Sequence, residues 1–127
     1  MIYITEEQLV ICYEDGTTIE ISLDQSLYPG AIEHIALIKE LRLEDPVKFG
    51  SDIFRLRKII WSVVSMIQIR LNSMASRDLE YAPLEERYKD YLRVSAFVIY
   101  FIRQLDAGFT VNTVTVPNPM MDSIVLN

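Results

Sequence analysis

The stretch Gln8–Leu23, QLVICYEDGTTIEISL, decides the fold class of this 127-residue chain. It holds two runs rich in β-branched and aromatic residues, separated by an Asp-Gly pair. Asp-Gly between such runs is a strong signal for a β-hairpin, because glycine adopts a positive φ without steric cost. In the second run Ile19, Ile21 and Leu23 alternate with polar residues, which indicates a strand buried on one face. We therefore predict an antiparallel hairpin, with a short third strand over residues 2–4.

After the hairpin, apolar residues follow helical spacing. A helix of medium length is expected from about Pro29, a favoured first-turn residue, to just before Pro46. Apolar residues at steps of three and four then predict one long helix over residues 51–74 and another over 84–107. The two long helices are similar in length and a short polar connection joins them. We therefore expect an antiparallel helical hairpin.

The C-terminal part of the chain alternates between strand-like and rigid sequence. Residues 109–116, FTVNTVTV, predict a strand, and Pro117 and Pro119 then form a stiff spacer. The expected organisation is a single α+β domain over residues 1–116, followed by an extended apolar arm over 117–127. This arm either docks on another chain or folds back on its own helices. Its expected contact residues are Met120, Met121, Ile124, Val125 and Leu126.

The formal net charge of −6 is distributed unevenly. Residues 1–38 contain seven acidic residues and no lysine or arginine, whereas all twelve basic residues lie within 39–103. Phosphate binding needs cations, so this distribution disfavours nucleic acid as a partner of the first third. The acidic residues either form a face that meets a basic surface or simply keep the hairpin soluble. The candidate acidic face consists of Glu6, Glu7, Glu14 and Asp15.

Residues with catalytic or metal-binding chemistry are few. The chain has one cysteine, Cys12, and one histidine, His34, in different predicted elements, and four dispersed glycines. This set fits neither a zinc site nor a phosphate-binding loop, so we expect no catalytic residue, metal or cofactor. A single cysteine excludes an intrachain disulfide, and no stretch resembles a secretion signal or a membrane span. A cytoplasmic location is expected, or a virion if the protein is viral.

These observations favour a non-enzymatic assembly subunit that makes protein–protein contacts, as in an oligomer, a multi-protein complex or a phage or viral particle. The long helices carry more apolar surface than a small sheet can hide, and oligomerisation commonly covers such surface. The expected partner is a protein, either a second copy or another subunit, and not a membrane. Its contacts would include Arg55, Lys58 and Trp61, unless Trp61 belongs to the core. The alternative is a small acidic inhibitor, antitoxin or DNA mimic that binds a basic partner.

Overall fold

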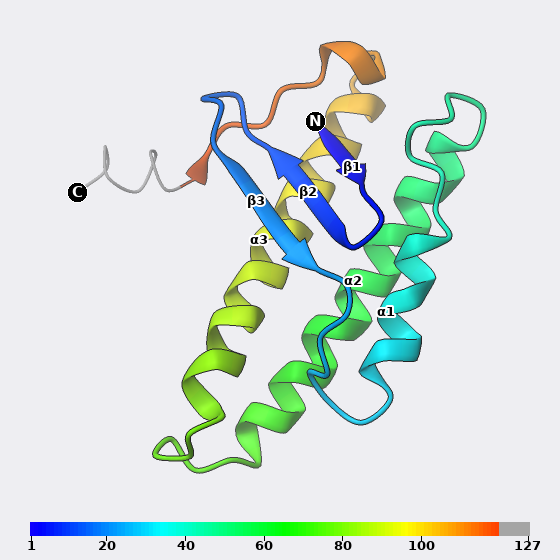
Figure 1. The fold of residues 1–127 in the computed structure, drawn as a ribbon. Coiled ribbons are helices and arrows are strands. Elements are labelled where there is room, and N and C mark those ends of the chain that lie inside the picture. Colours follow the sequence, from blue (N-terminus) through cyan, green and yellow to red (C-terminus); the bar gives the residue numbers. More distant parts are fainter. Residues whose placement is uncertain (120–127) are drawn as a thin grey trace.

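The computed structural model of the chain describes residues 1–119. The fold is α+β, as predicted, with a three-stranded antiparallel sheet in the order β1-β2-β3 (Figure 1). The elements in chain order are β1 (Ile2–Ile4), β2 (Gln8–Cys12), β3 (Thr18–Ser22), α1 (Ala31–Lys39), α2 (Phe49–Asn72), α3 (Tyr81–Asp106) and the 3-10 helix η1 (Val111–Thr113).

The three strands bury one face, which is lined by aliphatic side chains. Leu9 of β2 lies opposite Ile21 of β3, and Ile11 lies opposite Ile19. Because successive side chains in a strand point to opposite faces, these four residues share the face that joins the core. The β2–β3 turn closes at Gly16, whose φ of +87° is the left-handed conformation that the Asp-Gly pair predicts.

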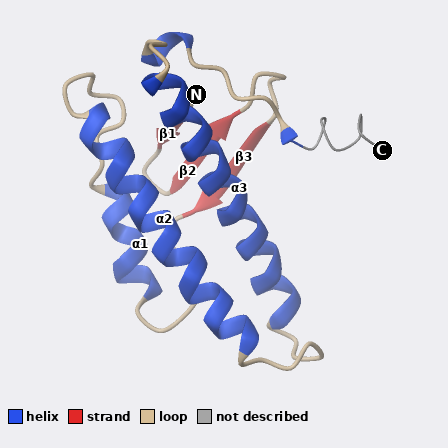
Figure 2. Cartoon of the chain, turned by 180° about the vertical axis from the view of Figure 1, so that it is seen from behind, coloured by secondary structure: helices blue, strands red, loops and turns tan. Residues whose placement is uncertain are grey.

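The sheet covers one side of the α2–α3 pair, and α1 lies beside α2 (Figures 1 and 2). α2 and α3 run in opposite directions, in agreement with the expected helical hairpin. Among residues 1–119, no helix or strand covers the side of this pair that faces away from the sheet (Figure 2). The buried stripe of α2 follows steps of three and four residues and comprises Ile53, Leu56, Ile60, Val63, Val64, Ile67 and Leu71.

α1 is shorter than the sequence predicts, because it ends at Lys39 rather than just before Pro46. Leu41 is buried, so the chain turns into the core at this point. The buried carboxylate of Asp52, in the first turn of α2, accepts a hydrogen bond of 2.7 Å from the backbone N–H of Arg42. A tertiary contact thus overrides the local helical pattern.

The C-terminal strand predicted over residues 109–116 is not confirmed. Thr110 and Thr113 exchange hydrogen bonds between their side chains and backbone N–H groups at the ends of η1. The side-chain oxygen of Gln104 accepts a further hydrogen bond from the backbone N–H of Thr115, at 3.2 Å. These local bonds occupy backbone groups that a β-ladder would require.

The last described residues, 114–119, lie beside the β2–β3 turn, and we call this segment the strap. Val114 and Val116 are buried, and the Val116 carbonyl accepts a hydrogen bond of 2.9 Å from the backbone N–H of Glu14. The strap therefore ends beside the turn (Figure 1). The arm residues predicted to contact a partner lie outside the described residues: Met120, Met121, Ile124, Val125 and Leu126.

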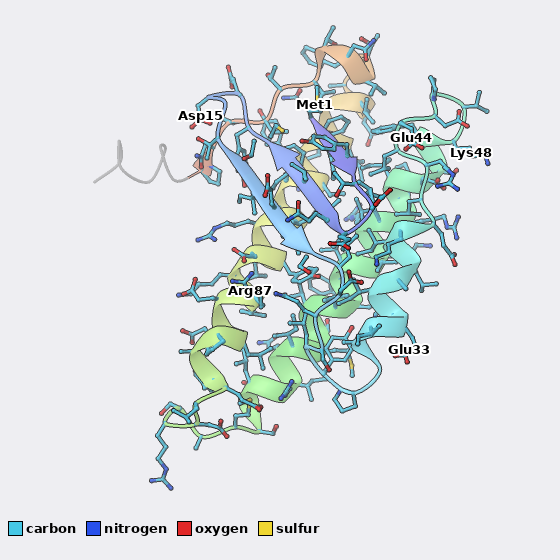
Figure 3. All side chains as sticks on the ribbon, in the orientation of Figure 1. Met1, Asp15, Glu33, Glu44, Lys48 and Arg87 are labelled. Atoms are coloured by element: carbon cyan, nitrogen blue, oxygen red, sulfur yellow. The ribbon has the colours of Figure 1, made fainter. Side chains whose placement is uncertain are left out.

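Replacing Asp52 should weaken the fold. We expect Asp52→Ala to lower the free energy of unfolding by about 2 kcal/mol, because the N–H of Arg42 loses its acceptor. Asp52→Asn should cost less, since an amide oxygen still accepts. Urea denaturation measures both values. Glu44→Ala, at an exposed position of the preceding loop, serves as the control (Figure 3). Equal stability of Asp52→Ala and the control would contradict this role of Asp52.

Candidate interaction surface

The outer side of α2 carries a stripe of exposed aromatic and basic side chains. Phe54, Lys58 and Trp61 follow one another at steps of four and three residues and therefore share one face of the helix. Trp61 is 64% exposed and Phe54 is 47% exposed. Trp61 is thus a surface residue rather than part of the core. Large aromatic side chains of this kind supply much of the energy of protein interfaces.

The exposed side chains of Phe54, Lys58 and Trp61 form one wall of a groove between α2 and α3. The groove has a volume of about 410 Å³. We refer to it as the α2–α3 groove, lined by Phe54, Arg57, Lys58, Trp61, Ser95 and Ile99. Ser95 and Ile99 come from α3, about 40 residues further along the chain, so the groove exists only once the helical hairpin has formed.

Two serine hydroxyls next to the stripe point back onto α2 itself. Ser62 donates to the carbonyl of Lys58 at 3.1 Å, and Ser65 donates to the carbonyl of Trp61 at 2.9 Å. Each hydroxyl therefore has an acceptor four residues earlier in its own helix. This arrangement leaves fewer free donors around Trp61 and makes the surface more suitable for apolar contact.

Further large apolar residues are exposed on both helices outside the groove. At least 39% of each of four further side chains is exposed, and these are Met66, Ile69, Leu92 and Tyr100. Single exposed apolar residues are ordinary, but several on adjoining helices are typical of an interaction surface. Both long helices therefore expose large apolar residues, in line with the expectation that they carry more apolar surface than the sheet can cover.

The basic side chains of the groove have no counter-ion within the described chain. Among residues 1–119, no carboxylate lies within 4.0 Å of the charged groups of Arg57 or Lys58. The side chain of Arg55, in contrast, lies 3.5 Å from the Asp52 carboxylate. The structure therefore brings Lys58 and Trp61 together, as the sequence predicted, but directs Arg55 toward Asp52.

The four predicted acidic residues form two separate groups. Glu6 and Glu7 lie in the β1–β2 connection, whereas Glu14 and Asp15 lie in the β2–β3 turn at the opposite end of β2. Five residues of strand separate the groups by about 17 Å. All four side chains are exposed. The exposed Glu20 projects from β3 between them, so the acidic character extends along the sheet side of the molecule.

Asp15 is held in place by the turn. Its carboxylate accepts hydrogen bonds from the backbone N–H of Thr17 at 2.8 Å and from the side-chain amide of Asn118 at 3.2 Å. The hydrogen bond from Thr17 is the main reason that the pKa of Asp15 is lower than its usual value. Asp15 therefore stays negatively charged well below neutral pH.

The polar residues with catalytic potential are spread over separate elements. The hydroxyl of Tyr28 lies 2.7 Å from Nδ1 of His34 and can donate to it. Cys12 lies on β2, opposite Thr18. Within the described residues, no three histidine, cysteine, aspartate or glutamate side chains lie close enough together to hold a metal ion. The α2–α3 groove, in contrast, brings exposed aromatic and basic side chains together.

Sequence reasoning identified two of the six groove residues, Lys58 and Trp61. The spacing of Phe54, seven residues before Trp61, is a signal that would have added it to this face. Arg57 adjoins Lys58 in the sequence, but only the fold shows that no carboxylate within residues 1–119 pairs with it. No local pattern pairs Ser95 or Ile99 with α2.

Comparison of the chain with models of protein families, with curated proteins and with solved structures returned no match. None of the helices within residues 1–119 has both the length and the apolar character needed to cross a membrane.

The fluorescence of Trp61, the one tryptophan, should report the charge of the groove. We expect iodide to quench it efficiently in dilute protein, because Arg57 and Lys58 raise the local concentration of anions. The double substitution Arg57→Gln/Lys58→Gln should reduce the iodide quenching constant about twofold. Quenching by the neutral molecule acrylamide should not change.

A matched control replaces two exposed cations elsewhere, with the double substitution Lys48→Gln/Arg77→Gln. This variant has the same net charge as the groove variant. If both variants lower iodide quenching equally, the effect comes from net charge and not from the groove.

Proposed function

We propose that this protein is a non-enzymatic assembly subunit that binds another protein surface through the α2–α3 groove. The main support for this proposal is that Trp61 is exposed beside Arg57 and Lys58, two cations that form no ion pair within residues 1–119. Tryptophan and arginine are enriched among the residues that dominate interface energies. An exposed tryptophan beside Phe54 contributes little to the stability of one isolated copy, but it stabilises a complex strongly when a partner covers it.

The size of the α2–α3 side also suits a stable interface. With α2 about 36 Å long and two helices side by side, this side measures about 36 Å by about 20 Å. That area is close to the roughly 800 Å² that each partner buries in a typical specific complex. The surface is therefore large enough for a specific interface of ordinary size.

The groove is better suited to binding than to catalysis. Its one hydroxyl belongs to Ser95, and its other lining side chains include no histidine or carboxylate that would activate a nucleophile. The proposed role is that of a component of an oligomer or larger complex, of which a viral particle is one example.

The solution mass of the full-length protein tests this function. Light scattering after size exclusion should give a mass well above 14.7 kDa, either one discrete multiple or a series of larger multiples. The double substitution Phe54→Ser/Trp61→Ser should shift the protein toward the monomer by at least tenfold in dissociation constant, because it removes the aromatic wall of the groove.

The control for loss of exposed apolar area is Val47→Ser/Leu79→Ser. Both positions are more than 90% exposed and lie outside the groove. This variant should retain the mass of the unchanged protein. A wild-type protein that stays monomeric at high concentration would contradict self-assembly and would instead favour an inhibitor that uses its acidic sheet side.

A further inference from the structure

The β2–β3 turn and the strap beside it form one corner of the molecule. We call this the hairpin corner and define it as Glu14, Asp15 and the strap residues 114–119. The backbone N–H of Glu14 bonds to the Val116 carbonyl at 2.9 Å, and the side chain of Asn118 bonds to Asp15 at 3.2 Å. Figure 3 shows Asp15 at this corner, next to the last described residues.

The hairpin corner is the point at which the described chain meets the C-terminal segment, and it carries two acidic side chains, Glu14 and Asp15. After Pro119 the sequence continues as MMDSIVLN, residues 120–127. Five of these eight residues are large and apolar, one is acidic and none is basic. Fully extended, eight residues reach about 27 Å from the corner. The corner and this segment together therefore offer an apolar ligand that is flanked by negative charge.

The α2–α3 groove has the complementary properties. Phe54, Trp61 and Ile99 form its apolar lining, and Arg57 and Lys58 supply positive charge that no described carboxylate neutralises. No acidic residue lines the groove. The two surfaces match in both hydrophobicity and charge, and charge complementarity of this kind favours one partner and one orientation over others.

Corner and groove lie on different sides of the molecule. The corner lies on the sheet side of the molecule. The groove lies between α2 and α3, and the side of this helix pair that faces away from the sheet has no covering helix or strand among residues 1–119 (Figures 1 and 2). A second copy can therefore use its corner on the first copy's groove while its own groove remains open. Such a contact joins unlike surfaces and repeats, so it builds a ring or a filament rather than a closed two-fold dimer.

We propose that the hairpin corner of one copy, with segment 120–126, binds in the α2–α3 groove of a second copy. Glu14 and Asp15 then face Arg57 and Lys58 across the contact. The apolar residues of the segment cover Phe54 and Trp61. This inference rests on the proposed function and specifies its partner as a second copy of the same chain, bound head-to-tail.

A complementation experiment with two full-length variants tests this arrangement. The groove variant Phe54→Ser/Trp61→Ser keeps an intact corner, and the segment variant Ile124→Ser/Val125→Ser/Leu126→Ser keeps an intact groove. Each variant alone should give 14.7 kDa by light scattering. An equimolar mixture should give a species of twice that mass and nothing larger, because each partner supplies only one working surface.

A charge exchange provides a second test that leaves the apolar residues unchanged. Lys58→Glu should weaken assembly at least tenfold, because like charges then meet across the contact. Adding Glu14→Lys to the same chain should restore assembly, since every copy then carries both exchanged partners. Adding Glu33→Lys instead, on the exposed side of α1, should not restore it. Circular dichroism confirms that each variant is folded.

The outcomes separate the two proposals. Wild-type assembly that the groove variant retains overturns the proposed function of the groove. A monomeric wild-type protein overturns the second copy as the partner and, with it, the present inference. Wild-type assembly that the groove variant loses but the segment variant retains overturns only the present inference. A segment variant that is monomeric and shows stronger iodide quenching of Trp61 than a monomeric wild type would place the segment in its own groove and would also overturn it.

Discussion

Helix α2 is buried along one stripe, and the other helices are arranged around it. α1 and α3 both contact α2, and the sheet lies over the pair that α2 forms with α3 (Figure 1). Each fully buried aliphatic side chain of the stripe contributes about 2 kcal/mol through burial. The stripe fixes the rotation of α2 about its axis and therefore determines which residues remain outside. Trp61 is exposed for this reason: its position on the helix lies off the stripe that the core requires.

Local sequence patterns predicted the parts of the fold that depend on local physics. The Asp-Gly pair identified the hairpin because a positive φ at Gly16 is a property of one residue. Helical spacing identified α2 and α3 because a helix buries a periodic face. The end of α1 was missed because it depends on a bond between Asp52 and Arg42, ten residues apart and in different elements. The predicted C-terminal strand is not confirmed, because side-chain bonds around Thr110 compete with strand pairing.

The candidate surface shows the same division between local and distant information. Lys58 and Trp61 share a face by helical spacing, so sequence alone placed them together. The separation of Arg55 from them depends on its ion pair with Asp52. Ser95 joins the groove only through the packing of α3 on α2, and no pattern within one helix encodes that contact. The acidic residues show a second limit of local patterns. Glu7 and Glu14 are close in the sequence, but β2 places them at opposite ends of a strand.

The uneven charge of the chain acquires a spatial meaning in the fold. Most acidic residues of the first third lie on the sheet and its turns, whereas Glu33 lies on α1. The basic middle third supplies the exposed cations beside Trp61. Within one copy these opposite charges lie on different sides, so most of them do not neutralise one another. In the proposed head-to-tail contact, the acidic corner of one copy meets the basic groove of the next copy, and this contact would join two kinds of surface that lie apart within one copy. Because a head-to-tail contact leaves one groove and one corner open at every step, the geometry of the contact, rather than its strength, determines whether the assembly closes into a ring or continues as a filament.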